Sequence, residues 1–304
     1  MSDFFDNITE FPSPEAKSRF EKLIGLDEAK DHLTKEARLI FNPLILEEWS
    51  KKHYKRKIKL IDQFKARAPL FIFAGDVGTG KTSLAESFGD TVAREEKISV
   101  TLYCLSLKTR GKGLVGEMTK LISDAFESIV KDARKFCRPG KKPSSAIILL
   151  IDEADALAQS RELEQMNHED KAGVNALIRG IDTVTANNLP VIVVLCTNRL
   201  NSIDPAVQRR AAVVFEFVRP NSEQREFILR EALEDIDFTD KQIKAFVEIT
   251  GESEERKYGY TYSDLRQRLL PKILLDALPD KPIHYERAFE IATSTKPTPP
   301  FKDL

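Results

Sequence analysis

Five short apolar runs set the fold class of this chain. They read APLFIFAG, ISVTLYCLSL, SAIILLIDEA, LPVIVVLCTN and AAVVFEFV, lie between residues 68 and 218, and are separated by amphipathic helical stretches. Strands that read as nearly continuous apolar runs are typical of parallel sheets that helices cover on both faces. The pattern therefore predicts an α/β fold with a five-stranded parallel sheet flanked by helices.

The strand pattern ends near Pro220. Beyond it, helical spacing returns near residues 222–235, 239–249, 262–277 and 284–293, which predicts a small all-helical domain. Residues before about 20 are mixed polar and contain two prolines, so we expect a loose arm there. The predicted organisation is an arm over 1–20, a large α/β domain over 21–219, a helical domain over 220–295 and a tail over 296–304.

Composition excludes several classes of protein. No apolar run approaches the ~20 residues that a membrane helix needs, and the acidic start MSDFFDNITE lacks the features of a secretory signal, so we expect a cytoplasmic protein without membrane contact. Cys104, Cys137 and Cys196 lie far apart, which argues against a disulfide framework or a zinc site. The net charge of −1 provides no overall attraction to nucleic acid.

The segment GDVGTGKT, Gly75 to Thr82, follows the apolar run LFIFA and precedes the helical stretch SLAESFGDTVA. It matches the G-x-x-x-x-G-K-[ST] phosphate loop in its strand-loop-helix context, where glycines let backbone N–H groups converge on phosphates. We expect Lys81 to reach the β- and γ-phosphates of ATP and Thr82 to bind Mg²⁺; the alternative is a glycine turn before a helix. The predicted nucleotide-binding residues here are Asp76, Val77, Gly78, Thr79, Gly80, Lys81, Thr82 and Ser83.

The apolar run IILLI ends in Asp152 and Glu153. Charged carboxylates seldom lie at the end of so apolar a strand unless they have a functional role. Asp152 suits the Mg²⁺ ion, and Glu153 suits a base that orients the attacking water. The alternative is a pair of acids that cap the next helix. The glutamate distinguishes an ATP-hydrolysing enzyme from a domain that only binds nucleotide.

Two further polar groups follow strands of the predicted sheet. Thr197 and Asn198 end the run VIVVLC, at the edge where ligands of such sheets collect. Asn198 either holds the attacking water or caps the following turn. Arg209 and Arg210 precede the fifth run, where they either offset a helix dipole or reach the γ-phosphate of a neighbouring subunit.

Together these residues resemble the AAA+ ATPases over roughly residues 20 to 295. The resemblance rests on the phosphate loop, DEAD at 152–155, Asn198 followed by IDPAVQRR, and the helical domain. It implies that Ile24 and Gly25, in LIGLDEAK, lie against the adenine. It also implies that Arg210, with Arg209 as second choice, acts in trans as an arginine finger within a ring, usually a hexamer.

In the helical domain, the resemblance points to a second sensor within GYTYSDLRQRLLP. Ser263 stands where many relatives carry the sensor arginine, and Arg266 is the nearest arginine. Arg266 is therefore the candidate, although the sequence departs from the family pattern.

Within AAA+, the segments GTGKTSL, VNALIRGID and DLRQRLLPKILLDAL resemble the HORMA-domain remodellers, the thyroid-hormone-receptor-interactor ATPases. This resemblance implies a HORMA-domain partner whose conformation is changed or whose complex is disassembled. Eukaryotic members carry an N-terminal adaptor-binding domain, whereas here the ATPase pattern begins almost at once. In this the chain is similar to bacterial versions associated with cyclic-oligonucleotide antiphage systems, in which a nucleotidyltransferase accompanies the HORMA protein.

The stretch GKGLVGEM, residues 111–118, places two apolar residues between glycines. They either pack locally or contact a partner. In AAA+ unfoldases the loop at this place projects into the channel of the ring, so the resemblance implies a loop that grips a threaded polypeptide, with Leu114 where relatives have an aromatic residue. A second loop, SRELEQMNHEDKAG, either lines the channel or is solvated. The predicted gripping residues are Gly113, Leu114, Val115 and Gly116.

Two other functions stay open at this stage. The basic run KKHYKRKIKL, residues 51–60, is either a solvated helix face or a contact of a nucleic-acid machine similar to a clamp loader. The third possibility is a nucleotide-gated assembly scaffold.

Overall fold

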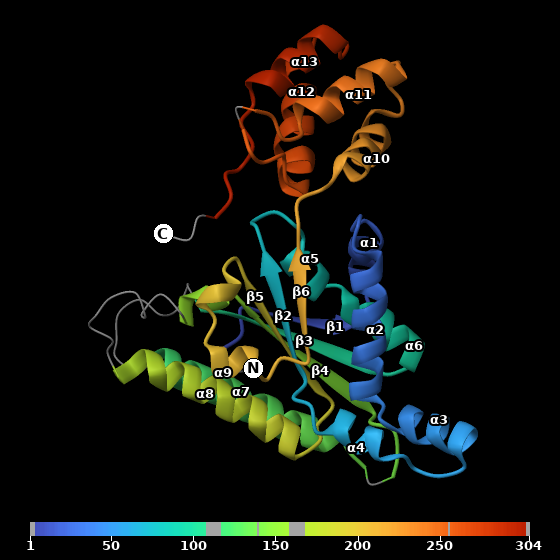
Figure 1. Cartoon of the computed structure of the whole chain (residues 1–304), viewed down its shortest axis with the longest axis vertical. Helices are drawn as coiled ribbons and strands as arrows, with labels where there is room; N and C mark the ends of the chain where they lie inside the picture. The colour runs from blue at the N-terminus through green and yellow to red at the C-terminus, as the bar shows by residue number, and fades with distance from the viewer. Residues whose placement is uncertain (1–3, 108–116, 139, 158–167, 255, 302–304) are drawn as a thin grey trace. The chain divides into compact units, whose positions relative to one another are not determined.

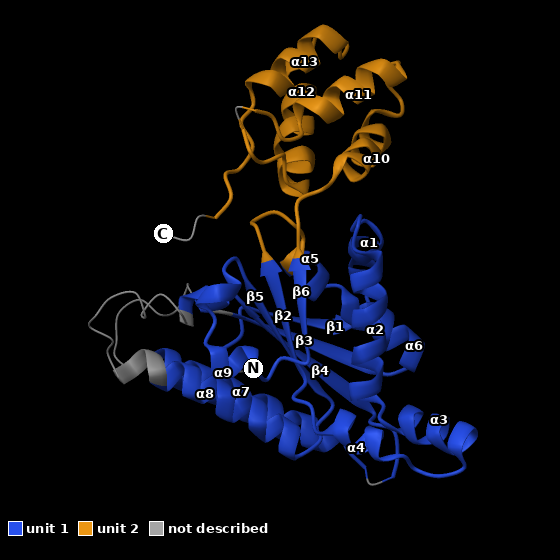
Figure 2. Ribbon diagram, in the orientation of Figure 1, with its two compact units in different colours: residues 1–74, 82–216 blue, residues 75–81, 217–304 orange. Residues whose placement is uncertain are grey.

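The computed structural model describes residues 4–107, 117–138, 140–157, 168–254 and 256–301 (Figure 1). The chain divides into two compact units, residues 1–74 with 82–216, and residues 75–81 with 217–304 (Figure 2). The second unit therefore combines the phosphate loop with the helical C-terminal region. Within the described ranges, no helix combines the length and the apolar composition needed to cross a membrane.

A six-stranded sheet forms the centre of the first unit, in the order β1-β3-β4-β5-β2-β6. Strands β2 to β5 pair in parallel, and β1 pairs antiparallel with β3. The predicted α/β fold with a largely parallel sheet is confirmed, with one strand more than predicted. The bounds are β1 (Asn7–Phe11), β2 (Leu70–Gly75), β3 (Ser99–Ser106), β4 (Ser145–Asp152), β5 (Val191–Thr197) and β6 (Val213–Phe217).

Helices cover both faces of the sheet (Figure 1). Alternate residues of β4 point to opposite faces. Ile147 and Leu149 join an apolar cluster completed by α7 (Glu117–Phe136) and α8 (His168–Ala186). On the other face Ile148 contacts α6 (Phe88–Glu96). A Cβ added to Gly89 of that helix would lie 2.8 Å from the Cδ1 atom of Ile148. Helix α2 (Asp27–Phe41) covers the same face as α6.

Residues 4–20 do not form a loose arm, so the prediction is wrong for this described part of residues 1–20. Residues 7–11 form β1, Phe5 and Phe11 are buried, and Ser13 caps α1 (Pro14–Glu21) while its N–H donates to Asp90 Oδ1 at 2.6 Å. The prolines suggested a loop, but Pro12 follows an edge strand and Pro14 occupies the first turn of a helix, two positions that tolerate proline.

The shorter elements of the first unit connect these layers. The basic run 51–60 spans the end of α3 and the start of α4, and its side chains are exposed except at Ile58. The bounds are α3 (Leu44–Tyr54), α4 (Lys59–Lys65), α5 (Lys81–Ala85), 3-10 helices η1 (Ala154–Leu157) and η2 (Leu200–Ser202), and α9 (Pro205–Gln208).

The second unit is helical, as predicted. Capping boxes at Asn221 and Thr239 begin its first two helices, and the third begins as a π-helix, η3, that continues into α12. Tyr260 and Phe246 are its largest fully buried side chains. The bounds are α10 (Ser222–Leu233), α11 (Asp240–Ile249), η3 (Asp264–Leu269), α12 (Leu270–Ala277) and α13 (Tyr285–Ser294).

Candidate active site

In the first unit, the carboxyl ends of parallel strands bring three predicted site residues together. Asp152 ends β4, and its Oδ2 accepts a hydrogen bond from Thr82 Oγ1 at 3.0 Å. Its Oδ1 accepts one from the N–H of Glu153 at 2.8 Å. A hydroxyl and a carboxylate are hard oxygen ligands of the kind that Mg²⁺ prefers. The donor set predicted from the sequence thus fits a magnesium ion.

Glu153 has an unusual backbone conformation, with φ of 54°. Residues other than glycine rarely adopt positive φ, and such positions concentrate at functional sites. The turn follows the end of β4 directly, so the side chain leaves the sheet at the edge that holds Asp152.

Asp155 has a role that the sequence analysis did not assign. Its buried carboxylate accepts hydrogen bonds from Thr197 Oγ1 and from the N–H of Asn198, both at 3.2 Å. Thr197 Oγ1 also accepts from the N–H of Arg199 at 3.0 Å. Asp155 therefore fixes the backbone at Asn198. The signal available in the sequence was a second acid shortly after Glu153.

Additional negative charge lies near Asp152. Burial raises the pKa of the Glu86 carboxyl, its ion pair with Arg19 opposes that rise, and the charge of Asp152 adds to it. Burial, with Glu86 and Asp152 nearby, also raises the pKa of the Cys104 thiol to about 12. The thiol therefore stays protonated at neutral pH, which removes it as a candidate nucleophile.

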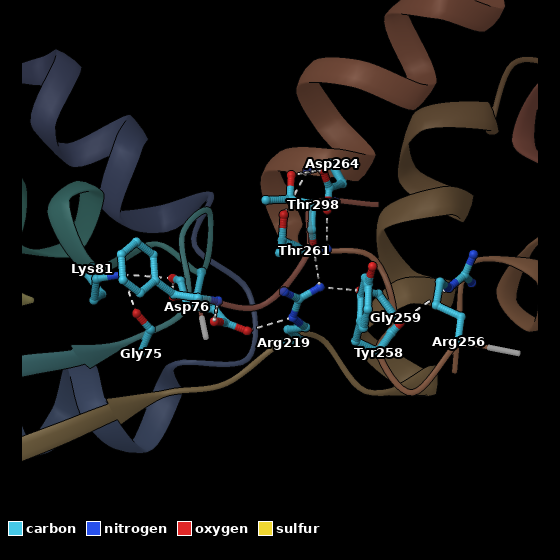
Figure 3. A network of polar contacts seen from close by, with 12 residues as sticks. Gly75, Asp76, Lys81, Arg219, Arg256, Tyr258, Gly259, Thr261, Asp264 and Thr298 are labelled. Carbon is cyan, nitrogen blue, oxygen red and sulfur yellow. Dashed lines mark hydrogen bonds and ion pairs between the residues drawn. The ribbon is translucent and has the colours of Figure 1, made fainter. Parts of the chain in front are cut away.

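The second unit contains the phosphate loop. Lys81 Nζ donates to the carbonyl oxygens of Gly75 and Asp76, both at 2.8 Å (Figure 3). Thr79 Oγ1 donates to the Asp76 carbonyl at 2.7 Å. Gly78 has φ of 77°, and a Cβ there would lie 2.8 Å from the Cβ of Ser263. Glycine is therefore required at this position by both its backbone conformation and its surroundings.

The carboxylate of Asp76 joins the loop to other segments of the second unit. Arg219 Nε donates to Asp76 Oδ2 at 2.8 Å, and the N–H of Phe301 donates to Oδ1 at 3.2 Å. Arg219 Nη1 donates to the carbonyls of Gly259 at 2.6 Å and Thr298 at 2.9 Å (Figure 3). Sequence reasoning missed Arg219, although it follows the last strand of the sheet closely, as Asn198 follows β5.

The two candidate finger arginines differ in their contacts. Arg210 Nε and Nη2 donate to the two carboxylate oxygens of Asp182 at 3.0 and 3.3 Å, and its Nη1 donates to the Ala206 carbonyl. Arg209 is exposed, and within the described part of the chain its side chain makes no hydrogen bond or ion pair; its backbone N–H donates to the Pro205 carbonyl at 3.0 Å. The side chain of Arg210 is thus engaged within its own chain and that of Arg209 is not.

The remaining predicted residues lie elsewhere. Ile24 is half-buried and Gly25 exposed, in the turn between α1 and α2. In the second unit Arg266 Nη2 donates to Glu231 Oε2 at 2.8 Å. The predicted gripping residues, Gly113 to Gly116, and most of the second loop lie outside the described residues.

Comparison with known proteins identifies relatives of the whole chain. Residues 71–219 match the ATPase family associated with various cellular activities (AAA). The CD-NTase-associated protein 6 of Escherichia coli strain MS 115-1 is 47% identical over 303 residues, covering 100% of this chain and 97% of that protein.

Two solved structures are also similar. One, of the HORMA:CdnC:Trip13 complex of E. coli MS115-1, matches with a TM-score of 0.91 and 47% identity, covering 98% of this chain and 97% of that chain. The other, of Rhizobiales Trip13, matches with a TM-score of 0.74 and 42% identity, covering 97% and 100%. The similarity to CD-NTase-associated protein 6 extends over nearly the full length of both aligned chains, and residues 71–219 match the AAA family. The chain therefore belongs to the CD-NTase-associated protein 6 family and contains an AAA ATPase domain.

Proposed function

We propose that this chain hydrolyses ATP in order to change the conformation of a HORMA-domain protein, or to disassemble its complex with a nucleotidyltransferase. The observation that carries the proposal is the match, end to end and at 47% identity, to a chain solved in a HORMA:CdnC:Trip13 complex. In this proposal the protein belongs to a bacterial cyclic-oligonucleotide antiphage system. It works in the cytoplasm as a homohexameric ring.

The residues at the sheet edge have distinct tasks in this proposal. Thr82 and Asp152 hold Mg²⁺, which offsets the negative charge of the phosphates when it is bound. Glu153 orients the attacking water and takes its proton. Asp155 holds the backbone at Asn198, so that the Asn198 amide lies where it contacts the water or the γ-phosphate. In the phosphate loop, Lys81 exchanges its two carbonyl acceptors for phosphate oxygens.

Arg209 is the better candidate for the finger that acts in trans. A trans-acting arginine must be able to leave its own subunit, and Arg210 would first have to break a two-bond pair with Asp182. Arg209 carries no such cost. The preference derived from the sequence, Arg210 before Arg209, is therefore reversed in the proposal. Ile24, Gly25 and Arg266 keep their proposed roles at the nucleotide, and Leu114 and Val115 that of gripping the partner.

The first test is a trap for the partner. Glu153→Gln should bind ATP without hydrolysing it, so the protein, purified from its native cells with ATP, should retain the partner and release it on ATP removal. Lys81→Ala, which loses ATP binding, is the matched control. Recovery of a HORMA-domain protein supports the proposal. Recovery of nuclease-sensitive nucleic acid instead would contradict it and direct attention to residues 51–60.

The second test separates the two arginines. Arg209→Ala and Lys81→Ala should each abolish hydrolysis alone, whereas their mixture should recover part of it, because an intact finger then meets an intact phosphate loop across some subunit boundaries. Arg210→Ala mixed in the same way should recover no hydrolysis if its role lies within its own chain. Recovery with Arg210→Ala and none with Arg209→Ala would reverse the assignment.

A further inference from the structure

We propose that Arg219 positions the phosphate loop, and that the C-terminal segment, residues 298–301, sets the affinity for ATP through Arg219. The inference rests on the proposed function, since ATP is the ligand of the loop. It concerns contacts within the second unit alone, and Figure 3 shows those that join Lys81, Asp76, Arg219 and Thr298.

Asp76 connects two sets of contacts. Its main-chain carbonyl accepts hydrogen bonds from Lys81 Nζ and Thr79 Oγ1, the two side chains that shape the loop. Its carboxylate accepts from Arg219 Nε and from the N–H of Phe301. Because one residue carries both sets, a shift of its side chain moves the carbonyl that orients Lys81.

Arg219 is itself held by two other segments. Its Nη1 donates to the carbonyls of Gly259 and Thr298, and its guanidinium lies over the Tyr258 ring, 5.1 Å from the ring centroid. The side chain is only 13% exposed, so these contacts are largely shielded from water. The planar guanidinium presents five N–H donors in a fixed fork, which lets one side chain reach acceptors on three segments.

The C-terminal segment is fixed by the buried carboxylate of Asp264. Asp264 accepts hydrogen bonds from the N–H of Thr298 at 3.0 Å and from its hydroxyl at 2.7 Å. The carbonyl of Thr298 accepts a hydrogen bond from Arg219. A continuous path of polar contacts therefore runs from Asp264 through Thr298, Arg219 and Asp76 to Lys81 (Figure 3).

One donor of Arg219 is unpaired, which favours release of residues 298–301 from this side chain. Its Nη2 is buried and has no hydrogen-bond partner within the described residues. A buried donor without an acceptor costs free energy. The contact between Arg219 and residues 298–301 is therefore less stable than it would be if every Arg219 donor had an acceptor. Any event that draws residues 298–301 away removes further acceptors, and the loop then loses its support.

The test measures ATP affinity in a Glu153→Gln background, where hydrolysis does not interfere, by titration with a fluorescent ATP analogue. Asp76→Ala, Arg219→Ala and a chain ending at residue 296 should each bind about tenfold more weakly. The double variant of Asp76 and Arg219 should bind no more weakly than either single one, because both belong to one path. Arg287→Gln, an exposed arginine paired with Asp276 in the same unit, is the control and should bind normally.

The outcomes are separable. Hydrogen exchange of residues 222–294 checks folding. If Asp76→Ala loses protection there, Asp76→Asn replaces it, since it keeps the shape of the side chain and loses only its charge. Asp76→Asn should still bind ATP severalfold more weakly. Normal affinity in all folded variants, additive losses in the double variant, or a loss with Arg219→Ala but not with the Asp76 variants would each overturn the inference. Failure of the Glu153→Gln parent to bind ATP would instead overturn the proposed function.

Discussion

The centre of the sheet and the core of the helical unit are stabilised in different ways. Residues Ala146–Ile151 of β4 and Val191–Cys196 of β5 are apolar and buried, and their polar backbone groups pair within the sheet. The helical unit buries Asp264, Arg225 and Tyr260 in its interior. The sheet thus depends mainly on the apolar area removed from water, and the helical unit on directional hydrogen bonds as well.

Two buried polar side chains of the helical unit, Tyr260 and Arg225, donate to backbone carbonyls. Tyr260 Oη donates to the carbonyls of Ala292 and Thr295 at 3.1 and 2.5 Å, and Arg225 Nη1 donates to the Pro220 carbonyl at 2.8 Å. Buried polar groups are tolerated only when they are paired, and pairing fixes the distances between the segments that supply the partners. The proposed link between the phosphate loop and the C-terminal segment depends on such fixed distances.

The largest expected effect is in the sheet. Leu149→Ala should lower the free energy of unfolding by about 2–5 kcal/mol, because it removes a fully buried side chain where neighbouring strands prevent collapse of the cavity. Chemical denaturation checks the value. Leu275→Ala, at a residue 69% exposed on α12, is the control and should change it by about 0.5 kcal/mol or less. Similar losses in both variants would remove the basis of the comparison.

A smaller effect is expected at Asp264. Asp264→Ala leaves the N–H of Thr261, the N–H and hydroxyl of Thr298, and Arg268 without their acceptor, and should cost about 1.5–3 kcal/mol. Hydrogen exchange should show lost protection over residues 260–298 and unchanged protection in β4. Lost protection in β4 as well would indicate that the two units unfold together.

Sequence patterns are local, and this determined which parts of the molecule could be predicted. Strands β2 to β6 are short apolar runs, and the phosphate loop, Asp152 and Glu153 form motifs of adjacent residues, so all were visible. Strand β1 was missed because its polar residues face solvent on a sheet edge, and Phe11 alone carries its burial. The Arg219 link was missed because its partner Asp76 lies 143 residues away. Long-range polar pairs of this kind have no periodicity.

Acidic pH offers a third way to compare the regions. Burial disfavours the charged form of Asp264, but hydrogen bonds from Thr261 and Thr298 outweigh it and lower its pKa below 3.8. A depressed folded-state pKa means that the unfolded chain binds the proton first, so this stabilisation is complete above the unfolded value and is lost as the pH falls through the folded one. Asp264→Asn should therefore flatten the loss of stability below about pH 4.

The first unit contains a matched site for the same measurement. Burial opposes ionisation of Glu96, yet hydrogen bonds from Asn42, Arg38 and Lys142 lower its pKa below 4.5. Glu96→Gln should flatten the acid response of the first unit, and Asp264→Asn that of the second, as followed by unfolding midpoints with probes in each unit. Equal flattening of both units by either variant would contradict the separate origins of their stability.

The smallest expected effect tests whether burial, not contact geometry, decides what a polar contact contributes. Arg287 donates to both carboxylate oxygens of Asp276 at 2.9 and 2.7 Å, a geometry as good as that of any pair in the helical unit's interior, and these hydrogen bonds raise the pKa of Arg287. Its side chain is 59% exposed, however, so water competes for both groups. Arg287→Gln should change the unfolding midpoint by no more than the error of the measurement, at low salt and at high salt. A loss comparable with that of Asp264→Ala would mean that the helical unit is stabilised by its ion pairs wherever they lie, and the contrast with the sheet would then be one of charge and not of burial.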